Sequence, residues 1–592
     1  MTATLARSTT NGVTPLANVV PLANREIRLI PDQRLRTHVE NCALDGLSTG
    51  YIMAAPQTAS LHSSPERSLE EVVRSLSHEC AFPVPVDVVS VRQTHISTVF
   101  LGGELVYKVK KPVKLPFLDF STVEQRHFFC HEEVRINRPW APDVYLGVVP
   151  VTREANGLRF EGSGPVVDWA VKMRRLPESA NLRSRLQHGL LEPRDLVRAA
   201  QRIAAIHRQA CCCVGDQAIE ADAEFRRKLR ENWEFARGLK PHVIEPQVLQ
   251  RLEKLSDEWL QRHDDILRRR ASEGHVRELH GDLRLEHVFL FPDRTPPSDI
   301  VILDGIEFDP GLRRIDVVAD IAFLVMELSF VGRRDLARDF ADVYFSETND
   351  VTGRSLLPLF AAYRSAVRAK VAAILGSEPE IPHPDRDEAL ARSRAHWLWC
   401  LSELDQPGRR PALVLVSGLP GTGKSTLARG LADAAHFDEV LRTDVVRKEL
   451  AAKSGPPSGS TDLYSADSTE RTYDECWCHT RKRLLSGGRV IVDATFQRES
   501  FRHRFLQLAL DCGARAVWLE CDAPAEVVQQ RLLARHGDPS DADWSVYQLV
   551  REHWEPASEF SERFHSTIEA GGFAASALDA ARHVLCAKGL AE

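Results

Sequence analysis

A glycine-rich loop between Gly418 and Thr426 is the most chemically specific segment of this 592-residue chain. It reads GLPGTGKST and matches the pattern G-x-x-x-x-G-K-[ST] at every fixed position. An apolar run at 412–417 precedes it, and a helix-like run at 427–432 follows it. Such a loop closes backbone N–H groups around phosphate oxygens, and the start of the following helix adds partial positive charge. The segment therefore predicts a site for a nucleoside triphosphate.

Two side chains of this loop have specific tasks in that chemistry. Lys424 is expected to reach the β- and γ-phosphates, both to bind ATP and to take part in catalysis, and the Ser425 hydroxyl is expected to bind Mg²⁺. The apolar run at 489–493 ends in Asp493, which we predict to be a second partner of the metal. ATP and Mg²⁺ are therefore the predicted cofactors. The other loop residues expected to contact ATP are Gly418, Pro420, Gly421, Thr422, Gly423 and Thr426.

Acceptor chemistry is indicated by an aspartate and an arginine downstream of the loop. Asp444 follows a strand-like run and stands three residues before Arg447. A carboxylate at a strand end that faces the phosphate loop can accept a hydroxyl proton, and an arginine one helical turn later can bind a substrate anion. We predict these roles for Asp444 and Arg447, with helix capping as the alternative for Asp444.

Two further arginines, Arg531 and Arg535, lie on a predicted helix that precedes a polar loop at 537–541. Paired arginines in that position are typical of a lid that closes over the site and neutralises the transferring phosphate. We predict this catalytic role for both, and ordinary surface arginines are the alternative.

A second pair of carboxylates lies in the middle of the chain. Asp282 stands in the tight loop Leu279-His-Gly-Asp-Leu283, and Asp304 ends an apolar run at 300–303. In such a pair one carboxylate can accept the proton of a hydroxyl, and the other can hold Mg²⁺. This segment therefore predicts a second phosphate-handling site.

The segment from about 68 to 400 resembles the aminoglycoside phosphotransferase family, which has a protein-kinase-like fold. The matching motifs are His280-Gly-Asp-Leu283, Leu303-Asp-Gly-Ile-Glu-Phe308 and Arg314-Ile-Asp-Val-Val-Ala-Asp320. The resemblance implies an α+β fold and an ATP-dependent transfer of phosphate to a hydroxyl group.

The resemblance also implies a role for individual side chains. Asp282 would be the catalytic base, Asp304 a metal ligand, and His280 a support of the catalytic loop. Lys108 would contact the ATP phosphates. The helical stretch at 123–137 offers Glu132 and Glu133 as ion-pair partners of Lys108, and we favour Glu133.

The chain departs from the family pattern at His287, where the family usually has an asparagine as the second metal ligand. Neutral imidazole is a poor ligand for Mg²⁺, so we expect one firmly held metal, with His287 at the position of the second ligand. The glycine-rich loop of such kinases is also absent near 93–97. Further on, Arg364, Arg368 and Lys370 could receive an anionic substrate, and a solvated helix face is the alternative that we favour.

The segment from about 411 to 592 resembles P-loop kinases related to polynucleotide 5′-kinase, gluconate kinase and zeta toxins. The phosphate loop, Thr443-Asp-Val-Val-Arg447 and the pair Arg531 and Arg535 carry this resemblance. The whole chain is similar to bacterial fusions of an aminoglycoside phosphotransferase-like domain with such a kinase, often labelled AAA family ATPases. We identify no second-region arginine finger and no ring-forming accessory domain.

A chain of 592 residues is expected to position these residues on more than one folded domain. Single hydrophobic cores stop growing near roughly 250–300 residues. A Ser-, Thr-, Asn- and Pro-rich extension at 1–64 is expected to be disordered. An α+β protein-kinase-like domain is predicted at 65–404, and the Pro- and Gly-containing segment 405–411 is predicted to be a linker. Alternating strand and helix patterns at 412–592 predict an α/β P-loop domain with a parallel sheet.

Composition narrows the function classes. The net charge of −7 disfavours a broad nucleic-acid surface. No run reaches the roughly 18 apolar residues of a transmembrane helix, and the twelve scattered cysteines are typical of free thiols in a reducing compartment. We therefore predict a cytoplasmic phosphotransferase with two Mg-ATP sites and a small-molecule hydroxyl acceptor. The alternatives are a nucleotide-gated regulator, with an N-terminal pseudokinase and a P-loop ATPase, and a 5′-hydroxyl polynucleotide kinase.

Overall fold

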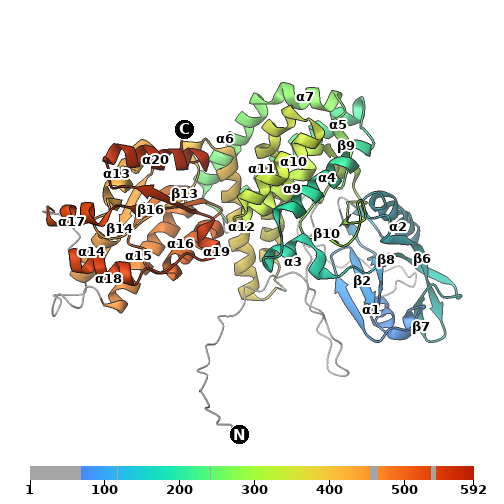
Figure 1. Ribbon diagram of the computed structural model, residues 1–592. Coiled ribbons are helices and arrows are strands. Elements are labelled where there is room, and N and C mark those ends of the chain that lie inside the picture. Colours follow the sequence, from blue (N-terminus) through green and yellow to red (C-terminus); the bar gives the residue numbers. More distant parts are fainter. Residues whose placement is uncertain (1–68, 116–117, 240–241, 380, 454–464, 535–541) are drawn as a thin grey trace, which may run out of the picture.

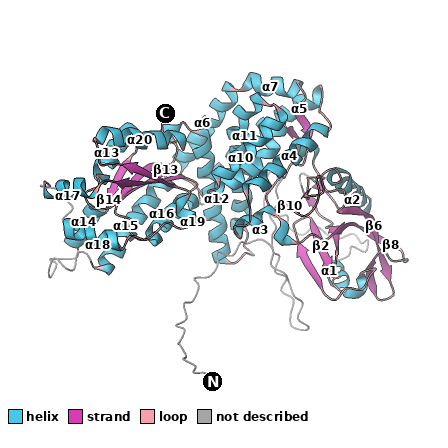
Figure 2. Ribbon diagram, viewed as in Figure 1, coloured by secondary structure: helices cyan, strands magenta, loops and turns pink. Residues whose placement is uncertain are grey.

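The computed structural model describes residues 69–115, 118–239, 242–379, 381–453, 465–534 and 542–592 (Figure 1). The extension at 1–64, expected to be disordered, lies outside the described residues. Figure 2 separates a mostly antiparallel strand region near the start of the chain, a helical middle and a C-terminal sheet covered by helices.

The first part is built on an antiparallel sheet that is six-stranded within the described residues. Helix α2 (Val123–Asn137) packs on it and begins with a capping box in which the Thr122 side chain accepts from Gln125 N. Buried aliphatic side chains of the sheet and of α2 form one core. In spatial order the strands are β1 (Val89–Gln93), β2 (Ser97–Gly102), β3 (Leu105–Lys110), β8 (Val166–Arg174), β6 (Tyr145–Glu154) and β7 (Gly157–Phe160).

Two short antiparallel pairs hold the loops that carry the central carboxylates. Strand β10 (Val288–Leu290) pairs with β11 (Ile300–Ile302). Strand β9 (Val276–Glu278) pairs with β12 (Arg314–Asp316). The loop that carries Asp282 joins β9 to β10, and the loop that carries Asp304 joins β11 to β12. Because β9 pairs with β12 and β10 pairs with β11, the two loops lie close together.

A helical region follows and shares one large apolar core. Its longest helix, α11, is buried along most of its length and packs against α12, α9 and α5. The helices of this region are α3 (Leu182–Gln187), α4 (Pro193–Gln209), α5 (Asp216–Gly238), α6 (Pro246–Arg262), α7 (Asp264–Ser272), α8 (Pro310–Arg313), α9 (Val317–Phe330), α10 (Arg334–Thr348), α11 (Val351–Ser377) and α12 (His383–Leu404).

The C-terminal part is an α/β domain whose sheet is parallel and five-stranded among the described residues. The predicted fold of this part is confirmed. The strand order is β14 (Glu439–Arg442), β15 (Arg489–Asp493), β13 (Ala412–Ser417), β16 (Arg515–Asp522) and β17 (His565–Glu569).

Helices cover both faces of this sheet. Helices α13 (Lys424–Ala434) and α20 (Ala574–Ala587) pack in one apolar core, and α15 (Ala466–Leu485) and α16 (Glu499–Asp511) pack in another. This burial of both faces explains why strand β13 is apolar at every residue except the last. The other helices of the domain are α14 (Thr443–Lys453), α17 (Ala525–Leu533), α18 (Trp544–Glu552) and α19 (Glu559–Glu562).

Helix α12 stands between the helical region and the C-terminal domain (Figure 1). Its Glu403 pairs with Arg334 of α10 at 2.7 Å and with Arg515 of β16 at 3.2 Å. A Cβ atom at Gly513 would come within 2.2 Å of Ala395 O, so the chain before β16 lies directly against α12. The two parts are therefore joined by close packing and by the largely enclosed carboxylate of Glu403, and not by a linker alone.

Candidate functional site

The phosphate loop connects the central strand β13 to the first turn of α13. Gly418 has φ 135°, and a Cβ atom there would lie 2.4 Å from Cys521 O of the neighbouring strand. Gly423, immediately before α13, has φ 102°. Both positions require glycine for backbone reasons. The sequence pattern is therefore matched by the strand, turn and helix that the chemistry needs.

A cavity of about 360 Å³ opens beside this loop. Lys424 lies in its wall and donates from Nζ to Leu419 O at 2.8 Å. Gly418, Pro420 and Thr422 are buried within the loop itself, and Thr422 Oγ1 also donates to Leu419 O. The loop residues that line the cavity are Gly421, Gly423, Lys424, Ser425 and Thr426.

Asp493 lies at the end of β15, next to the start of α13. Its carboxylate is buried, and the Ser425 hydroxyl lies near enough to favour the charged form and so to lower its pKa. Burial raises the pKa of Asp493, and the positive charges of Lys424 and Arg442 oppose that effect. Ser425 and Asp493, the two residues expected to hold Mg²⁺, are thus neighbours. A hydroxyl and a carboxylate are oxygen ligands of the kind that Mg²⁺ prefers.

Arg442 is a residue of this site that sequence reasoning missed. It ends β14 and its Nε lies 3.4 Å from Asp493 Oδ2, while its Nη2 lies 4.0 Å from Asp444 Oδ2. Its position, two residues before the predicted acceptor aspartate, was the available signal. Arg442 therefore lies between the two carboxylates, within ion-pair distance of each.

Asp444 lies two residues beyond β14, in the first turn of α14, because the helix starts directly after the strand. It is therefore neither at the strand end nor at the residue before the helix, where a cap would stand. Its side chain is 35% exposed, so a substrate can reach it. Arg447 is one turn further and donates from Nη1 to Thr469 Oγ1 at 3.2 Å, which directs it toward α15.

Arg531 of α17 also lines the cavity, together with Ala570, Ala574 and Ala577. It donates to Ala570 O at 2.8 Å and to Thr422 O at 3.5 Å, so it ties the chain after β17 to the phosphate loop. Its predicted partner Arg535 lies outside the described residues.

A second cluster of charged side chains lies between the antiparallel sheet and the central loops. Lys108 Nζ is 2.9 Å from Glu133 Oε1 and 3.0 Å from Asp304 Oδ1. Lys108 and Asp304, which are 196 residues apart, are therefore in contact, and Glu133 is the glutamate that pairs with the lysine. Lys110 and Glu307 extend the cluster, since Lys110 Nζ is 2.8 Å from Glu133 Oε2 and also contacts Glu307.

Lys110 and Glu307 were missed by sequence reasoning. Lys110 lies two residues after Lys108, on the same face of β3, and that spacing was the available signal. Asp304 itself adopts φ 63°, which is rare for a residue with a side chain, and its N–H donates to the Tyr145 hydroxyl at 3.2 Å. Such strain is often found at functional positions.

The loop that carries Asp282 is fixed by hydrogen bonds to buried groups. Burial lowers the pKa of His280 to about 4, so its ring is neutral at pH 7. Its Nε2 donates to Leu303 O at 2.8 Å, which leaves Nδ1 to accept from Asp282 N at 3.3 Å. The Asp320 carboxylate accepts from His280 N and Gly281 N. The matched motif at Asp320 therefore has a structural task that sequence reasoning left unassigned.

His287 lies against the same loop. Its Nδ1 is 2.9 Å from Asp282 O and 3.5 Å from Asp282 Oδ2. A carbonyl oxygen only accepts, so Nδ1 carries a proton. In this arrangement His287 contacts Asp282 through Nδ1, and its Nε2 lies 3.8 Å from Glu286 Oε1.

The expectation of a solvated helix face on α11 is wrong for two of its three residues. Arg364 and Lys370 are each 4% exposed, because α11 is enclosed by other helices. In the C-terminal domain, Arg502 is also fully buried and donates to Phe496 O and Glu555 O. In the described residues no helix is long and apolar enough to cross a membrane.

Comparison with known proteins identifies a matching family profile and two mycobacterial relatives. A family profile described as "AAA domain" matches residues 413–557. "Uncharacterized protein Rv2004c" of Mycobacterium tuberculosis is 34% identical over 461 residues, which are 77% of this chain and 88% of that protein. "Uncharacterized protein Mb2027c" of Mycobacterium bovis matches with the same identity and coverage.

Two solved kinase structures are similar to about a third of the chain. A gluconokinase from Sinorhizobium meliloti 1021 is 18% identical and covers 30% of this chain and 94% of its own, with a TM-score of 0.23. A putative kinase from Chloroflexus aurantiacus is 20% identical and covers 30% of this chain and 98% of its own, with a TM-score of 0.26.

Proposed function

The chain belongs to the family of the mycobacterial protein Rv2004c, and we propose that it is an ATP-dependent phosphotransferase whose C-terminal P-loop domain transfers phosphate to the hydroxyl group of a small molecule. The observation that carries the proposal is the convergence of Lys424, Ser425 and Asp493 beside a cavity of about 360 Å³, with Arg442 between Asp493 and Asp444.

The residues present fit Mg-ATP. The phosphate loop has glycines in the backbone conformations that turn N–H groups toward an anion, and the neighbouring pair Ser425 and Asp493 offers oxygen ligands for the metal. Bound Mg-ATP would supply the phosphoryl group and a divalent charge. Lys424 would hold the β- and γ-phosphates, and Arg531, which lines the same cavity, would add positive charge.

Asp444 is the proposed base. Its exposed carboxylate can accept the proton of an acceptor hydroxyl as that oxygen attacks phosphorus. Asp493 and Asp444 have different proposed roles because they differ in exposure. Asp493 is buried next to Ser425, whereas Asp444 is partly exposed on the other side of Arg442. Arg447, one turn away, would contact an anionic part of the acceptor.

A second transfer site in the N-terminal part is supported by the contacts of Lys108 with Glu133 and Asp304. We propose a protein-kinase-like fold for this part, with Asp282 as base, Asp304 as metal ligand and His287 at the position of the second ligand. The same contacts fit the alternative of a nucleotide-gated regulator, in which this site binds Mg-ATP without transfer. The acidic net charge makes a 5′-hydroxyl polynucleotide kinase the less favoured alternative.

The test uses the full chain with Mg-ATP and a panel of sugars, aminoglycosides, nucleosides and 5′-hydroxyl oligonucleotides. ADP formation that depends on an acceptor supports a kinase, and formation without any acceptor supports the regulator. Asp444→Asn and Asp282→Asn then assign the activity to one site or the other. An acceptor-dependent activity that survives both substitutions would contradict the proposed bases.

A further inference from the structure

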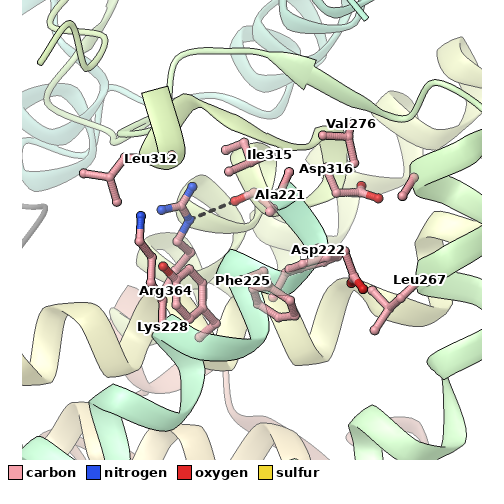
Figure 3. A pocket seen from close by; sticks show the side chains of 15 residues that line it. Ala221, Asp222, Phe225, Lys228, Leu267, Val276, Leu312, Ile315, Asp316 and Arg364 are labelled. Carbon is pink, nitrogen blue, oxygen red and sulfur yellow. Dashed lines mark hydrogen bonds between the residues drawn. The ribbon is translucent and has the colours of Figure 1, made fainter. Parts of the chain in front are cut away.

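Two features of the chain lie outside the candidate sites. One is a small pocket between α5, α11 and the segment 311–316, which Figure 3 shows with Arg364 donating to the carbonyl oxygen of Ala319. Its space of about 40 Å³ holds only a few water molecules, so it is too small for a substrate. The other is a pair of histidines on α2, His127 and His131, whose ring nitrogens converge.

The two imidazole rings face each other across one turn of α2. The Nε2 atoms of His127 and His131 lie 3.0 Å apart, and the ring centres lie 4.7 Å apart with an angle of 72° between the ring planes. The nitrogens are closer together than the ring centres, so each ring turns its Nε2 edge toward the other. Residues four apart are neighbours on a helix surface, and one ion between these rings therefore touches both.

These distances fit two nitrogen ligands of one metal ion. With metal–nitrogen bonds of about 2.05 Å, nitrogens 3.0 Å apart subtend an angle of about 94° at the metal. With each Nε2 lone pair aimed at the ion, the same arrangement separates the ring centres by about 4.7 Å, which is the observed value. A straight N–H···N hydrogen bond of the same length, directed along both rings, would separate the centres by more than about 5 Å.

The angle at the metal indicates the kind of ion. Neighbouring ligands of square-planar and tetragonal sites, which Cu²⁺ and Ni²⁺ adopt, meet at about 90°. Tetrahedral Zn²⁺ sites have angles of about 109°. In the part of the chain that the structure describes, no third His, Cys, Asp or Glu completes a metal-binding group with the pair, so water would fill the remaining positions.

The surroundings of His127 orient the pair and leave it accessible. The His127 ring stacks on Trp169 of β8, with the ring centres 3.8 Å apart and 23° between the planes. Burial, and after it the nearby charge of His131, lowers the pKa of His127 and favours the neutral ring that a metal requires. His131 is exposed, so an ion reaches the pair from solvent.

The pair is separate from the contacts of Lys108 with Glu133. Successive residues of a helix are about 100° apart, so Glu133 lies about 200° around α2 from His131. Glu133 is buried, whereas His131 is exposed. The two histidines therefore form a site of their own and do not belong to the N-terminal candidate site.

We propose that His127 and His131 bind one divalent transition-metal ion of square-planar or tetragonal preference, Cu²⁺ or Ni²⁺. The ion links two successive turns of α2 and stabilises the folded chain, as any ligand of the native state does. The proposal does not depend on phosphate transfer at either candidate site, and its test is independent of the proposed function.

The test measures Ni²⁺ binding by calorimetry to the full chain without a polyhistidine tag, in excess Mg²⁺ that fills sites with oxygen ligands. Ni²⁺ is the first probe because Cu²⁺ also reacts with the exposed thiols of the chain. Electron paramagnetic resonance of bound Cu²⁺ then reports nitrogen ligands through their hyperfine splitting.

His131→Ala is the main variant, because this side chain is exposed and its loss leaves the core intact. His127→Ala removes the other ligand. His583→Ala is the matched control, because His583 is exposed on α20 and its Nδ1 lies 2.8 Å from Asp579 O. Melting temperatures without added metal should agree for the parent chain, His131→Ala and His583→Ala.

The parent chain should bind one equivalent of Ni²⁺ more than either ligand variant, and His583→Ala should behave as the parent chain. Loss of a ligand should weaken this binding event by about 100-fold or more, since loss of an outer-shell partner alone costs about 10- to 100-fold. Ni²⁺ should also raise the melting temperature of the parent chain more than that of His131→Ala. Equal binding of Ni²⁺ and Cu²⁺ by the parent chain and His131→Ala overturns the proposal, and tighter binding of Zn²⁺ than of Cu²⁺ overturns the choice of metal.

Discussion

Replacing Lys424 by alanine is expected to weaken ATP binding at the C-terminal site by about 2–4 kcal/mol, the range for removing one partner of a buried charged contact. At 1.4 kcal/mol per factor of ten, this corresponds to an increase in Kd of about 30- to 700-fold. The structure makes compensation difficult. Arg531 is committed to carbonyl groups of the phosphate loop and of the chain after β17, and Arg429 is exposed and donates to Ser425 O.

The assay is calorimetric titration of the full chain with Mg-ATP. Lys424→Ala should remove the C-terminal binding event and leave the proposed N-terminal one. Lys588→Ala is the control, because this lysine is exposed, lies in the same domain and does not line the cavity. Melting temperatures of the two variants should agree within a few degrees, since neither side chain is part of the core. A titration of the Lys424→Ala variant that matches the parent chain would refute the assignment of the phosphate loop.

Three other substitutions test separate parts of the reasoning. Asp444→Asn should lower acceptor-dependent turnover by about 10²–10⁴ with nearly unchanged ATP affinity, and equal turnover would leave Asp444 without a catalytic role. His287→Asn should raise phosphotransfer by the N-terminal site, measured in the Asp444→Asn background, whereas loss of an existing activity would show that the imidazole itself is needed. Glu403→Gln should weaken the packing of α12 on the C-terminal domain. It should also make the free energy of unfolding less dependent on pH between about pH 2 and 4.5. Arg334 and Arg515 outweigh the effect of burial and lower the pKa of Glu403 to about 2, so its contribution is present above about pH 4.5 and is lost as pH falls toward 2. Urea unfolding between pH 2 and 6 measures this difference, and parallel curves for the parent chain and Glu403→Gln would argue against it.

Local sequence signals predicted the parts of the structure that depend on local chemistry. The phosphate loop needs glycines at fixed positions for backbone reasons, so its pattern identified the strand, turn and helix around it. The helix predicted at 123–137 has those bounds in the structure, where a capping box fixes its start. Strand-like apolar runs that alternate with helix-like segments predicted the parallel C-terminal sheet. Strands of such a sheet are buried on both faces and are therefore apolar throughout.

The contacts of the two candidate sites were only partly predictable. Lys108 and Glu133 were paired on the basis of resemblance, and the structure places them 2.9 Å apart. The neighbouring Lys110, Glu307 and Arg442 were missed, because their roles depend on which strand faces which loop. That information comes from strand register and from the pairing of distant segments, and not from the residues next to them in sequence.

The sequence by itself determined the kinds of chemistry, and only the tertiary structure decided which charged groups are buried. Arg364 and Arg368 are one helical turn apart, with Lys370 nearby, and were expected to form a solvated face. Helix α11 is enclosed by α5, α9 and α12, so the charges of Arg364 and Lys370 lie in the interior. Arg502 of α16 is also buried, where it donates to the carbonyl groups of Phe496 and Glu555. Helical periodicity shows which residues share a face, but burial depends on what packs against that face, and that is set by segments far away in the chain.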